Sequence, residues 1–174
     1  GTDYDFAAFY NEAGKSYWQT GNYTLADFSV EKVGNVGYSG FVNDSRTGLT
    51  IQFTRPIKVN GVNRGAVVIG MRMENCDWID QIKTELNTEV TIFSGQIRYA
   101  STIMDENGER LVGSEMPDYV AASVFGGSGE YEGTADINGQ KHYVYYQQFT
   151  DIDGNPAGAY LAACSAEDSD SLKM

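Results

Sequence analysis

The chain has 174 residues, with 24 Asp and Glu against 12 Lys and Arg, which gives a net charge of −12 and a pI near 4.3. This excess of negative charge argues against nucleic acid or an anionic membrane surface as a partner. The longest apolar run, residues 66–71, is strand-sized, far below the roughly 18 residues that cross a bilayer. The length fits one large domain or two small ones.

The cysteine count and the richness in glycine and tyrosine limit the structural classes to which the chain can belong. Cys76 and Cys164 are too few for a disulfide framework or for a zinc site without histidines. They form either one disulfide or two buried free thiols. Twenty glycines and twelve tyrosines favour an all-β or α+β surface protein.

The first part of the chain predicts a helix followed by strands. Residues 3–14 place Phe6, Phe9, Tyr10 and Ala13 on one helical face. Apolar alternation and turn residues then predict strands over 37–42, 48–58 and 65–73, with a hairpin turn at Asn60-Gly61. Pro56 should end the central strand pairing, because proline has no N–H to donate.

The middle of the chain predicts a helix, a hairpin and a second helix. Residues 75–87 carry an apolar stripe (Trp78, Ile79, Ile82 and Leu86) and begin with Asn75 or Asp77 as the cap. A hairpin over 89–98 turns at Ser94-Gly95, and a short helix over 117–125 stops at Gly126-Gly127.

The last part predicts three antiparallel strands, over 129–137, 140–150 and 158–164, with turns at Asn138-Gly139 and Asp153-Gly154. Residues 76–165 therefore read as an α+β domain built on a five-stranded antiparallel sheet. The acidic residues 166–174 read as a solvated tail.

An internal repeat relates the two halves at a constant offset of 93 residues. Identical residues at this offset are mostly glycines, which mark constrained backbone: Gly34/Gly127, Tyr38/Tyr131, Gly40/Gly133, Gly61/Gly154, Gly65/Gly158 and Ala66/Ala159. The repeat predicts two related modules. At this offset the hairpin of the second module has no counterpart in the first, so residues 1–75 are expected to be a partial module that lacks its opening hairpin. We expect that hairpin to lie upstream, although a degenerate copy is the alternative.

Catalytic and metal chemistry find little support in the sequence. His142 is the sole histidine and has no nucleophile motif beside it, so a catalytic triad is not arguable and a sheet-face histidine is the default. The acidic turns 105–108 and 151–154 could hold calcium through oxygen ligands, but neither has the spacing of a calcium loop. Ordinary turn chemistry explains both. We therefore predict a protein that is not an enzyme and that carries no metal or cofactor.

The second module resembles a Cache domain, the PAS-like extracytoplasmic sensor of bacterial methyl-accepting chemotaxis proteins and sensor kinases. The segments that carry the resemblance are 90–102, 107–114, 129–133, 138–146 and 153–158. Residues 9–57 are similar to the back half of the distal module of a double Cache domain. Some amino-acid-binding double Cache domains carry Arg-x-Trp-Tyr on the pocket lid; here the corresponding run is Ala7-Ala8-Phe9-Tyr10, without the arginine and tryptophan. Asp44 remains where such families hold an amine.

The resemblance implies a ligand pocket, and the residues suggest which side chains could serve it. Arginine can hold a carboxylate with two parallel hydrogen bonds, tyrosines offer flat faces with a hydroxyl, and Thr or Ser add polar contacts. The candidates in the second module are Arg98, Tyr99, Thr102, Arg110, Ser114, Tyr143 and Tyr145; those in the first are Tyr10, Trp18 and Asp44. The structural alternative has the tyrosines as cross-strand pairs and the arginines paired with nearby carboxylates.

The functional expectation is an extracytoplasmic domain of a transmembrane chemoreceptor that binds a small organic acid or amine. Residues 1–75 would be the membrane-distal module, 76–165 the membrane-proximal one, and 166–174 would lead toward a membrane helix; a homodimer is compatible with this arrangement. The same input domain serves histidine kinases and cyclic-dinucleotide enzymes. A secreted carbohydrate-binding β-module is the alternative of another class, and it predicts exposed, coplanar aromatic pairs such as Tyr17 with Trp18 or Tyr143 with Tyr145.

Overall fold

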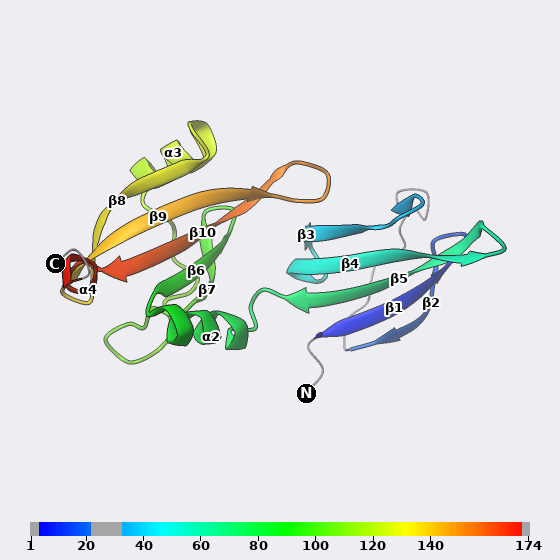
Figure 1. Cartoon of the computed structure of the whole chain (residues 1–174), viewed down its shortest axis with the longest axis horizontal. Helices are drawn as coiled ribbons and strands as arrows, with labels where there is room; N and C mark the ends of the chain where they lie inside the picture. The colour runs from blue at the N-terminus through cyan, green and yellow to red at the C-terminus, as the bar shows by residue number, and fades with distance from the viewer. Residues whose placement is uncertain (1–3, 22–32, 172–174) are drawn as a thin grey trace. The chain divides into compact units, whose positions relative to one another are not determined.

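The computed structural model describes residues 4–21 and 33–171, and the side chains as far as Asp168. The chain divides into two compact units, residues 1–72 with 151–155 and residues 73–150 with 156–174. Each unit contains a five-stranded antiparallel sheet (Figure 1). The expected α+β fold on a five-stranded antiparallel sheet is confirmed. Within the described residues, no helix has the length and hydrophobicity of a membrane span.

The first unit is a sheet of strands in the order β2-β1-β5-β4-β3. Its strands are β1 (Phe6–Asn11), β2 (Ser16–Thr20), β3 (Tyr38–Asp44), β4 (Gly48–Val59) and β5 (Val62–Arg72). A small core lies on one face of the sheet, formed by Phe6, Ala8, Tyr10 and Val68.

The second unit repeats this topology in the order β7-β6-β10-β9-β8. Its elements are α2 (Asp77–Leu86), β6 (Glu89–Ser94), β7 (Ile97–Ser101), α3 (Asp118–Gly126), β8 (Glu130–Ile137), β9 (Gln140–Thr150), β10 (Pro156–Ser165) and α4 (Ala166–Ser171). Apolar residues of β6, β9 and β10 form the main core with α3, including Phe93, Val124, Val144 and Leu161.

The helix expected over residues 3–14 is wrong, because β1 and β2 form an antiparallel hairpin there. Phe6, Ala8 and Tyr10 are buried at a spacing of two, as a strand requires. The first unit therefore has its opening hairpin. Tyr10 pairs with Ala66 in the first unit, and Phe93 pairs with Ala159 in the second. Tyr10 and Phe93 are 83 residues apart, so the two opening hairpins correspond at an offset of 83. A comparison without gaps at an offset of 93 therefore misses them.

One further local expectation is corrected by the pairing of the strands. Pro56 does not end the pairing of β4 with β5, since it pairs with Ala66 and β4 continues to Val59. Strand β3 accompanies β4 only as far as Thr54, so Pro56 lies where β4 is an edge strand, which tolerates proline.

The expected caps of α2, Asn75 and Asp77, are not its N-cap residue. The N-cap is Cys76, which makes no side-chain cap bond. Asn75 nevertheless accepts a hydrogen bond from the Asp77 N–H at 3.2 Å.

Candidate functional site

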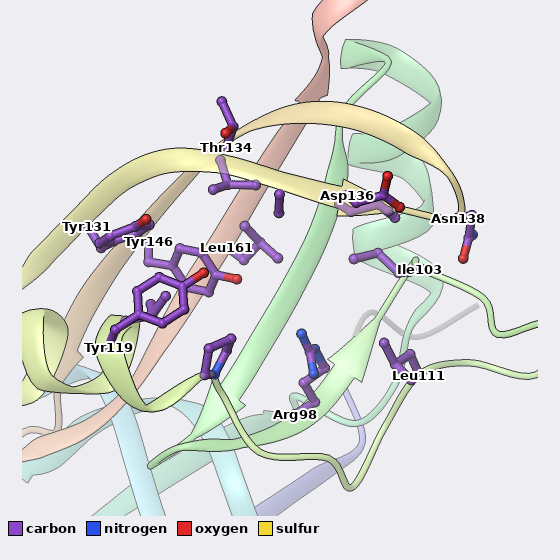
Figure 2. Close-up of a pocket in the computed structure, with 15 residues that line it drawn as sticks. Arg98, Ile103, Leu111, Tyr119, Tyr131, Thr134, Asp136, Asn138, Tyr146 and Leu161 are labelled. Atoms are coloured by element: carbon purple, nitrogen blue, oxygen red, sulfur yellow. The ribbon is translucent and has the colours of Figure 1, made fainter.

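A cavity of about 440 Å³ lies in the second unit, on the face of the sheet that α3 covers. Its floor comes from β9 and β10 and its walls from β7, β8, α3 and the segment between β7 and α3. The lining residues are Arg98, Ile103, Leu111, Pro117, Tyr119, Val120, Tyr131, Thr134, Ala135, Asp136, Ile137, Asn138, Val144, Tyr146 and Leu161 (Figure 2). The volume is typical of sites for small organic ligands.

Arg98 projects into this cavity from β7, and the backbone around it explains its position. Its N–H donates to the Ser114 carbonyl at 2.9 Å, and its own carbonyl accepts from the Gly113 N–H at 2.8 Å. Gly113 has a φ of 76°, which lets the chain turn back along β7. The same return brings the Ser114 hydroxyl to 2.8 Å from Arg98 Nη1.

The Arg98 side chain is half-buried. It lies over the Phe93 ring, with 5.4 Å from Cζ to the ring centroid. Burial lowers the pKa of Arg98, and its electrostatic interaction with Tyr146 opposes that shift. An arginine nevertheless stays cationic at neutral pH, so the cavity wall carries a fixed positive charge.

Three tyrosines gather at one side of the cavity (Figure 2). The rings of Tyr119 and Tyr131 are 5.6 Å apart and those of Tyr131 and Tyr146 are 6.0 Å apart, both edge to face at 69°. Burial raises the pKa of Tyr146, so its hydroxyl is a neutral donor at neutral pH. Asp136 and Asn138 lie at the other end of β8, where the Asp136 carboxylate accepts a hydrogen bond from the Gly139 N–H at 2.8 Å.

Of the ten candidate binding residues, the structure places Arg98 in the cavity lining. Ser114 contacts Arg98 directly. Tyr143 and Tyr145 point to the opposite face of β9 from Val144 and Tyr146, and the Tyr145 hydroxyl donates to Glu130 at 2.8 Å.

The other candidates of the second unit have partners outside the cavity. The Tyr99 hydroxyl donates to Glu74 at 3.3 Å, and the buried Thr102 hydroxyl accepts from the Val90 N–H at 2.9 Å. Arg110 pairs with Asp80 of α2, with 3.0 Å between Nη1 and Oδ1, and this pairing raises the pKa of Arg110.

The three candidates of the first unit are not brought together. Tyr10 is buried in the small core. Trp18 is 49% exposed on β2, with its ring edge to face with Phe9 at 62°. Asp44 ends β3 and accepts a hydrogen bond from the Arg46 N–H at 2.8 Å.

Other side chains that raised chemical hypotheses have structural roles. Among the described residues, no group of acidic, histidine or cysteine side chains could hold a metal ion. His142 is buried, with Nδ1 at 3.0 Å from the Gln140 carbonyl. Cys76 and Cys164 are free thiols.

Comparison with known proteins assigns the family. The model of single Cache domain 3 matches residues 56–173, more than half of the chain, and the chain belongs to this family. No curated protein matches it by sequence. Cache domains are ligand-binding sensor domains, typically extracytoplasmic or periplasmic.

Two solved structures share the fold at low sequence identity, and a third is reported beside them. The periplasmic domain of Vibrio cholerae LuxQ matches with a TM-score of 0.52 and 16% identity, covering 93% of this chain and 72% of that one. An extracellular ligand-binding receptor from Desulfohalobium retbaense has a TM-score of 0.52 and 11% identity, covering 92% and 30%. The ligand-binding domain of Pseudomonas fluorescens chemoreceptor CtaA, solved with L-isoleucine, has a TM-score of 0.49 and 13% identity, covering 98% and 73%.

Proposed function

We propose that the chain is the extracytoplasmic input domain of a transmembrane receptor, and that the second unit binds a small organic molecule in its cavity. The observation that carries this proposal is the cavity itself, which combines one half-buried cation, three tyrosines and an apolar floor. A mostly apolar lining with a few polar groups is typical of a binding site for a small organic molecule.

We infer a path for the signal within the second unit. Leu161 lines the cavity from β10, and β10 runs directly into α4 at Ala166. A ligand that prefers one arrangement of α3 and β10 over another would shift the position of α4. In this proposal residues 1–75 form the membrane-distal part, 76–165 the proximal part, and 166–174 lead toward a membrane helix.

The output that we propose is chemotaxis, through a methyl-accepting receptor. A histidine kinase or a cyclic-dinucleotide enzyme is the alternative, because both classes of receptor use input domains of this fold. The distinction needs the full-length receptor: a ligand found with this domain should change methylation-dependent swimming bias in the first case and kinase or cyclase activity in the second.

Ligand binding is tested by a thermal-shift screen of organic acids, amino acids, amines and sugars. A true ligand at a hundredfold excess over its Kd stabilises the folded state by about 2.7 kcal/mol. Ala135 lines the cavity, so Ala135→Phe should fill part of it and abolish the shift. Ala122→Phe, at an exposed position of α3, is the matched control and should keep it. A broad panel without any stabilising compound would contradict the proposal.

A further inference from the structure

One buried donor of Arg98 has no hydrogen-bond partner in the described part of the chain. Nη1 donates to the Ser114 hydroxyl at 2.8 Å and to the Glu115 carbonyl at 3.4 Å. Nε is buried and makes no hydrogen bond. A buried donor that is left unsatisfied is costly, so an acceptor that reaches this N–H would stabilise the side chain.

The edge of the guanidinium that has no hydrogen-bond partner among the described residues has the right geometry to bind a carboxylate. Nε and the neighbouring Nη2 form one side of the planar fork, which can donate two parallel hydrogen bonds to a carboxylate. Contacts to Ser114 and to the Phe93 ring hold the plane of the fork before any ligand arrives. Arg98 is also the one cation among the described lining residues.

The rest of the cavity suits a flat apolar body with no second charge. The edge-to-face rings of Tyr119, Tyr131 and Tyr146 offer the geometry that aromatic rings prefer in pairs. At the other end of β8 the Asp136 carboxylate would repel a second acidic group.

We propose that the cavity of the second unit selects aromatic monocarboxylates, with Arg98 as the anchor of the carboxylate and the three tyrosines around the ring. This inference rests on the proposed function and specifies its ligand. It assigns this selectivity to the second unit. Arg98 pairs with Phe93 there, whereas the residue that pairs with the corresponding Tyr10 of the first unit is Ser16.

Calorimetry with a matched set of probes tests the class. Relative to phenylacetate, phenylacetamide removes the charge, phenethylamine reverses it, hexanoate removes the aromatic ring, and the dicarboxylate 4-carboxyphenylacetate adds a second carboxylate. Phenylacetate should bind most tightly. Arg98→Met should weaken phenylacetate binding about ten- to hundredfold, the usual loss for a charge-assisted hydrogen bond, and change phenylacetamide binding less than about threefold.

Controls separate loss of the anchor from loss of the fold. Arg64→Met removes an exposed arginine of the first unit, paired with Glu12 at 3.0 Å, and should leave phenylacetate binding unchanged. Ser114→Ala keeps the charge but removes one support of the guanidinium, and should weaken phenylacetate binding less than Arg98→Met does. If Arg98→Met proves unfolded by circular dichroism, Ser114→Ala and the phenylacetate-to-amide preference of the unaltered chain decide the matter.

The outcomes distinguish this inference from the proposed function. Tighter binding of phenethylamine, hexanoate or the dicarboxylate than of phenylacetate overturns the aromatic-acid class and leaves a ligand-binding cavity in place. Binding of phenylacetate that survives Arg98→Met in a folded variant overturns the anchor. A folded chain that binds no compound of this set or of the broad screen overturns both.

Discussion

Two aspartates that could be taken for calcium ligands instead organise turns in the same way. Asp105 Oδ1 accepts hydrogen bonds from the N–H groups of Asn107 and Glu109, at 2.8 and 2.9 Å. Asp151 Oδ1 accepts from those of Asp153 and Asn155, at 2.9 and 2.8 Å. These bonds stabilise the charged carboxylates and lower the pKa of both aspartates.

The lowered pKa of Asp105 predicts a specific acid sensitivity. A depressed folded-state pKa contributes stability that is fully present above the unfolded-state value near 3.8 and is lost as pH falls through the lower folded value. Asp105→Asn keeps an acceptor oxygen but cannot titrate. We therefore expect the difference in stability between the native chain and Asp105→Asn to be constant above about pH 5 and to shift against the native chain below pH 4, as measured by urea unfolding across pH. A difference that does not change with pH would contradict this role.

The residues of the cavity show what the sequence can and cannot predict. Arg98 was identifiable because a cation is rare in this acidic chain and stands in a short strand. Tyr146 was missed in favour of Tyr143 and Tyr145, since aromatic residues occupy both phases of β9. Val144 could have shown which tyrosine faces inward. It is buried on the same face of β9 as Tyr146, because side chains two residues apart in a strand point to the same side. Tyr119 and Tyr131 reach the cavity only through tertiary packing of α3 on β8, which no local pattern encodes.

At the scale of elements, pairing with distant strands determined the secondary structure of a segment whose local pattern fitted both helix and strand. Residues 6–10 are apolar at both helical and strand spacing, and such a short run is read equally well either way. Pairing with β5 on one side and β2 on the other makes this segment a strand. Strongly alternating strands with Asn-Gly turns were predictable, and Asn60 and Asn138 do adopt the left-handed backbone conformation expected of them.

The repeated glycines of β5 and β10 explain why the internal repeat could be seen at all. A Cβ at Gly65 would stand 2.1 Å from the Tyr10 carbonyl oxygen, and one at Gly158 would stand 1.9 Å from that of Phe93. Each glycine thus permits close approach of the strand that carries the opening hairpin. The repeat marks a constraint on strand pairing rather than a ligand site.

Gly158→Ala should therefore weaken the pairing of β10 with β6. We expect a loss of about 2–3 kcal/mol in the free energy of unfolding, because the backbone oxygen of Phe93 must move. Gly126→Ala, at the end of α3 where a Cβ would meet nothing within 4 Å, is the control and should not lose stability, because alanine favours a helix more than glycine does. Urea titration of both variants makes the comparison; equal stabilities would show that the two strands do not approach as closely as described.

At the scale of the whole molecule, one topology occurs twice with different contents. Both units have the same strand order, and in the second unit α3 and the long segment between β7 and α3 form walls of the cavity. The two copies also differ at the position of the anchor, where Ser16 stands in place of Arg98. We infer that the shared sheet supplies the scaffold and that, in the second unit, α3 and the segment before it supply ligand recognition.

Hydrogen–deuterium exchange with and without a stabilising compound tests the central claim most directly. The account predicts slower exchange in β7, in the segment 102–117, in α3 and in β8–β9, with the strands β1 to β5 unchanged. Protection confined to the first unit, or protection that persists in Ala135→Phe, would contradict the claim that the cavity of the second unit is the ligand site.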